Sequence, residues 1–309
     1  MSRSDLVRRC EIALSKFPPG STVCGPTVFH LLGIKLSQVV RPGDDQTIHI
    51  AVQRDLRLRP PDWIVMHRPR HFAAAWRRLG PVLLAHPALC WLQLVNSAFT
   101  GTGLGTAIGF PSDPTLVPAD WGPRAERKGL HRPISPAQTG LFTSPARLRF
   151  LELVQLADQL LCRKSPLLEH SDFVRQLTHR PAAHGIPLAR LIFSHARPGT
   201  DSPPETRLRL TLVDGGYSVP IVNHPITDSS GRVIRWADLA ILDEMVDLEY
   251  QGGYHFEGPA AVHRDRERRQ DLDRLGWQLV EVVWSDFDNP AAIYSRLDRA
   301  LDKSRKLAA

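Results

Sequence analysis

Three polar residues suited to metal and phosphate chemistry, Asp238, Glu249 and Gln251, lie close together in the C-terminal third of the chain. A turn is predicted at Asp243 and Glu244, between two strand-like runs. In a two-residue hairpin the cross-strand partners have a constant sum of residue numbers. Asp238 and Glu249 have the same sum as the two turn residues, so we expect the carboxylates to face each other on one side of a sheet. Gln251 shares the face of Glu249 because side chains alternate along a strand.

Two carboxylates directly opposite each other repel, which an ordinary sheet does not favour. A hard divalent cation with oxygen ligands, Mg²⁺ or Mn²⁺, would turn this repulsion into a binding site. The alternative is that one or both carboxylates face solvent or pair with an arginine such as Arg235.

Two further side chains are candidates for the same chemistry. Glu205 closes the sequence Ser202-Pro203-Pro204-Glu205, which has the form of a helix start, so its alternative role is the last position of a capping box. His255 follows a Gly-Gly turn and could contact phosphate or assist proton transfer near neutral pH, although a single histidine in a loop often has no such role.

A charged helix, AAVHRDRERRQDLDRL, is predicted after these residues. Arg264, Arg266, Arg268 and Arg269 lie on it and are candidates for contacts with nucleic-acid phosphates, which would make affinity salt-dependent. Asp265 and Arg269 are four residues apart and would form a supporting ion pair. The alternative is a solvated face on which acidic and basic residues are interleaved.

The elements that must position these residues follow from hydrophobic periodicity after residue 200. They are a helix that stops at Gly215-Gly216, three strands, the charged helix, an apolar strand after Gly276 and a final helix from near Pro290. This alternation predicts an α/β domain. The strands correspond to the runs YSVPIVNHPI, RVIRWADLAIL, MVDLEYQ and WQLVEVV.

The first part of the chain is predicted to be an α+β domain over residues 1–170, followed by the C-terminal domain over residues 171–309. Helices are predicted in GPTVFHLLGIKL, HPALCWLQLVNSA and RLRFLELVQLADQLLCR, and strands in QTIHIAVQRD and DWIVMHRPR. Residues 100–145 are rich in Gly and Pro and are expected to form a long loop or insertion.

Composition is consistent with a polyanionic partner. The net charge of +7 comes mainly from arginine, which suits phosphate contacts, although a high-GC coding bias would also enrich this residue. The four cysteines show no zinc spacing, which is typical of a reduced cytosolic chain. With no apolar leader and no stretch long enough to cross a bilayer, we expect a cytoplasmic protein that does not bind membranes. The oligomeric state does not follow from the sequence.

The segments RWADLAILDEMVDLEYQGGYH and RDRERRQDLDRLGWQLVEVV resemble the C-terminal domain of a widespread, especially actinobacterial, protein family. That domain is similar to the very-short-patch-repair endonucleases and belongs to the PD-(D/E)XK superfamily. Over about residues 200–290 the resemblance implies a restriction-endonuclease-like fold, with a mixed central sheet flanked by helices. The family pattern has counterparts at Glu205, Asp238, Glu249-Tyr250-Gln251-Gly252, His255, Asp265 with Arg269, and Gly276-Trp277.

This resemblance implies a metal-dependent nuclease that hydrolyses DNA, with RNA as an alternative substrate. Asp238 and Glu249 would ligate Mg²⁺ or Mn²⁺ with support from Glu205, and Gln251 would take the position of the superfamily lysine. A neutral amide lacks the charge of lysine, so the rate is expected to be low.

The N-terminal half more loosely resembles the region that precedes such domains in proteins named after AbiEi-type antitoxins. This implies phage defence or a toxin–antitoxin module with a partner protein. The alternative function is a DNA-binding or antitoxin-like regulator without turnover.

Overall fold

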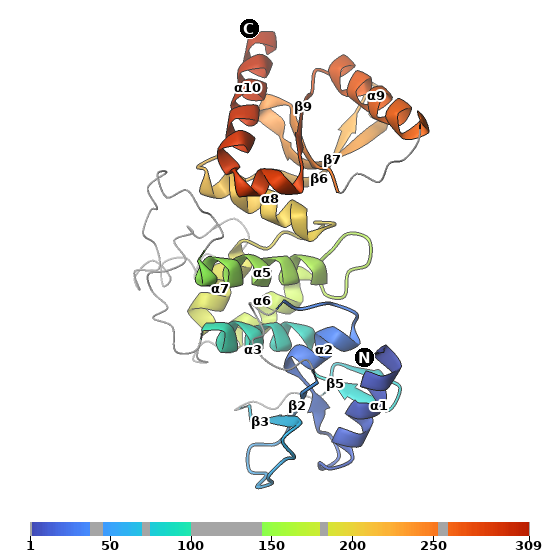
Figure 1. Ribbon diagram of the computed structural model, residues 1–309, viewed down its shortest axis with the longest axis vertical. Coiled ribbons are helices and arrows are strands. Elements are labelled where there is room, and N and C mark those ends of the chain that lie inside the picture. Colours follow the sequence, from blue (N-terminus) through green and yellow to red (C-terminus); the bar gives the residue numbers. More distant parts are fainter. Residues whose placement is uncertain are drawn as a thin grey trace.

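The computed structural model describes residues 2–37, 46–69, 75–99, 144–179, 185–252 and 259–308. Figure 1 shows an elongated arrangement in which a small N-terminal sheet, a layer of helices and a C-terminal sheet follow one another along the long axis. Within these ranges, no helix combines the length and apolar character that crossing a membrane requires.

The N-terminal sheet is mixed and has the strand order β3-β2-β1-β5-β4. The predicted helix and the two predicted strands in this region are confirmed as α2, β2 and β3, whereas α1 and the β4–β5 hairpin were not predicted. The elements are α1 (Arg3–Leu14), β1 (Thr22–Val23), α2 (Gly25–Leu31), β2 (Ile48–Ala51), β3 (Ile64–His67), β4 (Arg77–Leu79) and β5 (Val82–Leu84).

The helical layer shares a hydrophobic cluster with this sheet. Trp91 on α3 is fully buried and its indole N–H donates to the carbonyl of Leu153 on α5 at 2.8 Å. The predicted domain boundary near residue 170 falls at the start of α6 and stays a prediction, and the predicted loop lies outside the described residues from 100 to 143. The layer consists of α3 (Pro87–Phe99), α5 (Pro145–Leu160), α6 (His170–Thr178) and α7 (Ile186–Ser194).

Helix α8 (Pro203–Asp214) lies between the helical layer and the C-terminal sheet (Figure 1). Leu208 and Leu212 pack in the cluster of the C-terminal sheet, whereas Leu210 packs in the N-terminal cluster. Positions four apart share one face of a helix and the position between them points the other way. The sequence of α8 therefore provides one apolar side for the helical layer and another for the C-terminal sheet.

The C-terminal sheet is mixed, with the order β6-β7-β8-β9 and a single parallel pair, β8 with β9. Its hydrophobic cluster joins one sheet face to α8 and α10, and a smaller cluster joins the opposite face to α9. The predicted order of elements after residue 200 is confirmed. They are β6 (Ile221–Thr227), β7 (Val233–Ile241), β8 (Val246–Tyr250), α9 (Pro259–Arg274), β9 (Gln278–Val282) and α10 (Pro290–Ala308).

The turn between β7 and β8 differs from the predicted two-residue hairpin. A 3₁₀ turn over Leu242–Glu244 is followed by Met245 in the left-handed region, with φ of 48°. This longer connection leaves the predicted register unchanged, because Ala240 pairs with Asp247 and Ile241 with Val246. The whole described chain is thus an α/β structure in which helices flank two mixed sheets.

Candidate functional site

Asp238 and Glu249 lie where β7 and β8 separate. The paired register ends at Leu239 with Leu248, and one step further the backbone N–H of Tyr250 donates to Oδ2 of Asp238 at 3.2 Å. Asp238 is half-buried and Glu249 is only 1% exposed. Burial raises the pKa of Asp238, and the Tyr250 N–H bond partly offsets this effect.

Asp247 is a third carboxylate on the same face as Glu249, and it was not predicted as a site residue. It is 0% exposed, and neither of its carboxylate oxygens has a hydrogen-bond partner within the described chain. Burial raises its pKa to about 7, with the charge of Arg268 opposing this and the charge of Asp238 adding to it. The alternation rule that linked Gln251 to Glu249 also links Asp247 to it, so the signal was present in the sequence.

One guanidinium lies against this acidic group. Arg268 on α9 forms an ion pair with Glu249, and its positive charge also acts on Asp238 and Asp247. Burial lowers the pKa of Arg268, while the two aspartates raise it. The alternative that an arginine pairs with the site is therefore realised by Arg268, whereas Arg235 lies 3.6 Å from Asp271.

Glu205 approaches the same region from α8. It is 6% exposed and accepts hydrogen bonds from the Ser202 hydroxyl at 2.7 Å and from the Asp201 backbone N–H at 3.0 Å. The Ser202 side chain makes no bond to the helix backbone, so the reciprocal capping box is not formed. Burial raises the pKa of Glu205, and the negative charge of Asp238 adds to the shift. The two carboxylates are therefore electrostatically coupled across two elements.

Gln251 is positioned by β9. Its backbone N–H donates to the Val282 carbonyl at 2.8 Å, and its side-chain amide lies 3.4 Å from Glu281. Arg269 forms a 2.6 Å bond to the same Glu281, and its predicted pair with Asp265 stays a prediction. The side chains of Asp265, Arg264 and Arg266, and all of His255, lie outside the described residues.

Two cations from the loop between α5 and α6 lie near the acidic group. Arg163 and Lys164 lie 2.6 Å and 3.2 Å from Asp201, and their charges reach Asp238. The Arg163 guanidinium stacks 5.1 Å from the ring of Trp236, which is 48% exposed on β7. These contacts of Arg163 and Lys164 with Asp201 and Trp236 were not predicted from the sequence. The residues come from distant parts of the chain and share no local pattern.

As the side chains stand, no three His, Cys, Asp or Glu residues in the described ranges are close enough together to hold a metal ion. The negative charge of Asp238 acts on Glu205 and on Asp247, and Glu249 lies beside Asp247 on β8. Their oxygens suit a hard divalent cation by type, and a change of side-chain conformation would be needed for them to converge on one.

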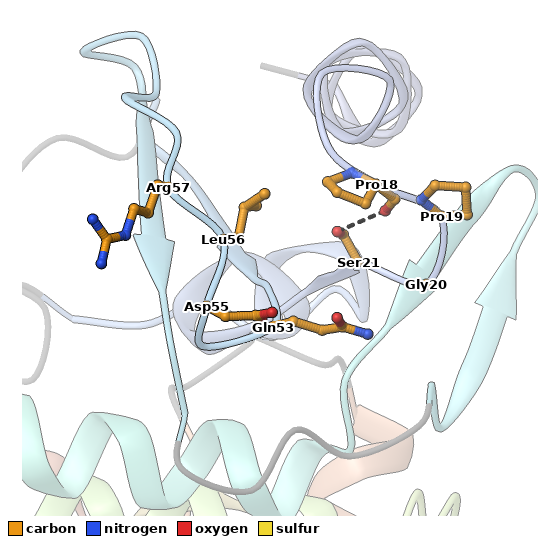
Figure 2. Close-up of a pocket in the computed structure, with 8 residues that line it drawn as sticks. All are labelled: Pro18, Pro19, Gly20, Ser21, Gln53, Asp55, Leu56 and Arg57. Carbon is orange, nitrogen blue, oxygen red and sulfur yellow. Dashed lines mark hydrogen bonds between the residues drawn. The ribbon is translucent and has the colours of Figure 1, made fainter.

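A hollow of about 240 Å³ lies in the N-terminal part of the structure, between residues 18–21 and residues 53 and 55–57 (Figure 2). Its Ser21 hydroxyl donates to the Pro18 carbonyl at 2.8 Å, and Arg57 points away from it. Among the described residues of its lining, Asp55 is the one carboxylate and none is a predicted site residue. The hollow therefore offers no counterpart to the acidic group on the C-terminal sheet.

Comparison with known proteins gives relatives without an assigned activity. The chain is 30% identical over 136 residues to the uncharacterized proteins MT2308 and Rv2248 of Mycobacterium tuberculosis, from strains CDC 1551 and H37Rv. This covers 44% of the present chain, which spans about half (50%) of the length of each relative. No family model matches the chain, and no solved structure matches it.

Proposed function

We propose that the protein is a Mg²⁺- or Mn²⁺-dependent nuclease that hydrolyses DNA phosphodiester bonds through a restriction-endonuclease-like C-terminal domain. One observation carries the proposal: Asp238 and Glu249 lie on neighbouring strands at the point where these separate, beside the buried Glu205 of α8. The mixed four-stranded sheet with helices on both faces supports the fold assignment.

The residues fit the chemistry of a hard cation. Asp238 and Glu249 would hold it, and Glu205 would support them from α8. When bound, such an ion acts as a Lewis acid that lowers the pKa of water and stabilises negative charge on the reacting phosphate. Arg269, whose side chain is 54% exposed, would contact the nucleic-acid backbone, and the Gln251 amide would donate a hydrogen bond to a phosphate oxygen.

The biological setting that we propose is phage defence or a toxin–antitoxin module with a partner protein. It rests on the loose resemblance of the N-terminal half to the region found in AbiEi-type antitoxin proteins. The net charge of +7 is compatible with either DNA or RNA as the polyanion.

The test is cleavage of supercoiled plasmid and of short single- and double-stranded DNA or RNA in Mg²⁺, Mn²⁺ or EDTA. Asp238→Asn and Glu249→Gln should each reduce metal-dependent nicking by about 100-fold or more, since each removes a charged oxygen ligand. Glu244→Gln is the matched control, because Glu244 pairs with Arg305 in the turn beyond the site and its loss should leave the rate unchanged. Equal rates in all variants would refute the proposal.

A second candidate function is a DNA-binding regulator without turnover. Two observations favour it. The first is that the Arg268 guanidinium forms an ion pair with the carboxylate of Glu249. The second is that the neutral Gln251 takes the position that a charged lysine has in the superfamily pattern. Fluorescence anisotropy in EDTA separates the candidates, because the regulator would bind DNA without metal and cleave it under no condition. A nuclease would show metal-dependent nicking in the same preparation.

A further inference from the structure

Asp247 is a buried carboxylate that the proposed mechanism does not use. Its cross-strand neighbours are Ala240 on β7 and Leu279 on β9, so the adjacent strands present it with apolar side chains. Neither of its oxygens accepts a hydrogen bond within the described residues, and its side chain has no solvent exposure. Burying an ionised carboxylate without partners costs several kcal/mol, and a compensating positive charge would remove this cost.

Asp247 is also oriented toward the acidic group already described. Residues two apart on a strand share a face, so Asp247 lies beside Glu249 and diagonal to Asp238. The other side of β8 is filled by Val246 and Leu248, which pack in the cluster of α8 and α10. The Asp247 side chain therefore belongs to the face covered by α9.

The positive charge of Arg268 acts on this group of carboxylates. Arg268 forms an ion pair with Glu249, and its charge is the strongest one acting on Asp247. It acts on Asp238 as well. The charges of Lys164 and Arg235 also act on Asp238 and Asp247, respectively, but these two cations form their ion pairs with Asp201 and Asp271. One guanidinium paired with the group cannot neutralise three carboxylates when all are ionised, and a divalent cation would balance the remaining negative charge.

We propose that Asp247 is the third carboxylate of the cation centre formed with Asp238 and Glu249, and that the Arg268 guanidinium fills this centre when the cation is absent. This inference rests on the proposed function, since it adds a ligand and a competing side chain to the same site. Cation binding requires Arg268 to leave Glu249 and the carboxylates to change rotamer, because they do not converge as they stand.

The inference predicts opposite effects of substitution on stability and on metal binding. Asp247→Asn removes a charge that the apo protein buries at a cost, so its melting temperature in EDTA should rise or stay level. Its affinity for Mn²⁺ should fall by about tenfold or more, as expected for the loss of one charged ligand. Asp247→Val, an apolar side chain of similar size, should show the same pair of effects.

The experiment is titration of Mn²⁺ followed by electron paramagnetic resonance on the full chain, without nucleic acid. The charge-matched control is Asp271→Asn, because Asp271 lies on the same helix as Arg268 but pairs with Arg235 and Arg274. Its Mn²⁺ affinity should stay within about twofold of the wild type. Arg268→Gln removes the competing cation and should bind Mn²⁺ at least about threefold more tightly.

The outcomes separate this inference from the proposed function. If Asp247→Asn and Asp247→Val melt at lower temperature and bind Mn²⁺ like the wild type, Asp247 is a structural residue and the inference is wrong. Unchanged or weaker Mn²⁺ binding by Arg268→Gln also overturns it. Loss of Mn²⁺ affinity in the Asp247 variants together with an inert wild-type protein on DNA and RNA would support the inference and refute the nuclease.

Discussion

Gln251 is the residue at which the sequence departs from the pattern that it resembles. Its amide lies 3.4 Å from Glu281, which also accepts a 2.6 Å bond from Arg269. An ammonium group at this position would keep an acidic partner and would add positive charge beside Glu249. The local structure is therefore compatible with either side chain.

We predict that Gln251→Lys increases the rate of metal-dependent plasmid nicking by about tenfold, because a charged donor contributes more than a neutral amide to a developing negative charge. Gln251→Met has similar length and no polar group, and it should be slower than the wild type. The measurement is the initial nicking rate at saturating Mg²⁺. A rate for Gln251→Lys at or below that of the wild type would contradict a role of residue 251 in charge stabilisation.

The residues of the candidate site were predictable to different degrees. Asp238 and Glu249 follow from a strand register that holds even though the turn is longer than expected. Asp247 obeys the same alternation and was overlooked. Arg268 could not be assigned to Glu249 from the sequence, because its neighbours on the charged helix are also arginines and only the packing of α9 on the sheet selects one of them.

At the scale of elements, a buried ion pair joins α5 to α8. The guanidinium of Arg209 donates to Asp158 at 2.6 Å and to the His195 carbonyl at 2.6 Å, and the Thr206 hydroxyl donates to Asp158 at 2.7 Å. Arg209 and Asp158 are 0% and 1% exposed. Burial raises the pKa of Asp158, and the charge of Arg209 opposes this shift.

We predict that Arg209→Met lowers the free energy of unfolding by about 3–5 kcal/mol, because it leaves the Asp158 carboxylate buried without its counter-charge. The comparison is Arg305→Met, which removes an exposed pair with Glu244 and should cost less than about 1 kcal/mol. Urea denaturation followed by circular dichroism measures both. Equal effects in the two variants would show that the buried pair does not hold these helices together.

Two histidines join the neighbouring parallel strands β2 and β3. Nδ1 of His49 lies 2.9 Å from Nε2 of His67, and the rings stack with centroids 5.1 Å apart. One ring must donate and the other accept, so the contact requires a neutral nitrogen. Burial lowers the pKa of His67 below its usual value.

This lowered pKa determines the direction of a pH effect. The unfolded chain binds the proton more readily than the fold does, so the contribution of His67 to stability is complete above about pH 6.5 and is lost as the pH falls through the lower folded pKa. Burial lowers the pKa of His86 as well, whereas the raised pKa of Asp247 stabilises the fold toward pH 5. These two groups act equally in the wild type and in His67→Gln. We therefore predict that the change in melting temperature from pH 7 to pH 5 is more negative in the wild type than in His67→Gln. An identical change in the two proteins would contradict this role of His67.

The elements themselves were predictable where their ends carry signals. Helix α8 was identified from Ser202 and the prolines after it, despite the alternating sequence RLRLTL, which on its own favours a strand. Helix α1 begins with a capping box between Ser2 and Asp5, a start signal from which this helix could also have been predicted. Only the folded chain explains the alternation in α8, because both sides of this helix are buried.

At the scale of the whole molecule, α8 is the described element that contributes core residues to both of the larger hydrophobic clusters. Leu210 packs with the N-terminal cluster, while Leu208 and Leu212 pack with the C-terminal sheet, and all three are 0% exposed. The candidate site depends on this arrangement, because Glu205 lies in the first turn of α8 and Asp238 on β7. Hydrophobic periodicity could not place the two sheets on opposite sides of one helix, because the partner of each helix face is chosen by tertiary packing.

We therefore predict that the two clusters unfold together. Leu210→Ala should lower the free energy of unfolding by about 2–5 kcal/mol, the usual cost of such a cavity in a core. Hydrogen exchange read by mass spectrometry should show reduced protection in peptides from both α5 and β8, although Leu210 packs only in the first cluster. Leu307 on α10 is 67% exposed, so Leu307→Ala should change the free energy of unfolding by less than about 0.5 kcal/mol. It should leave the protection of both peptides unchanged. Loss of protection confined to α5 would show that α8 transmits no stability to the C-terminal sheet, and the acidic site would then be held by that sheet alone.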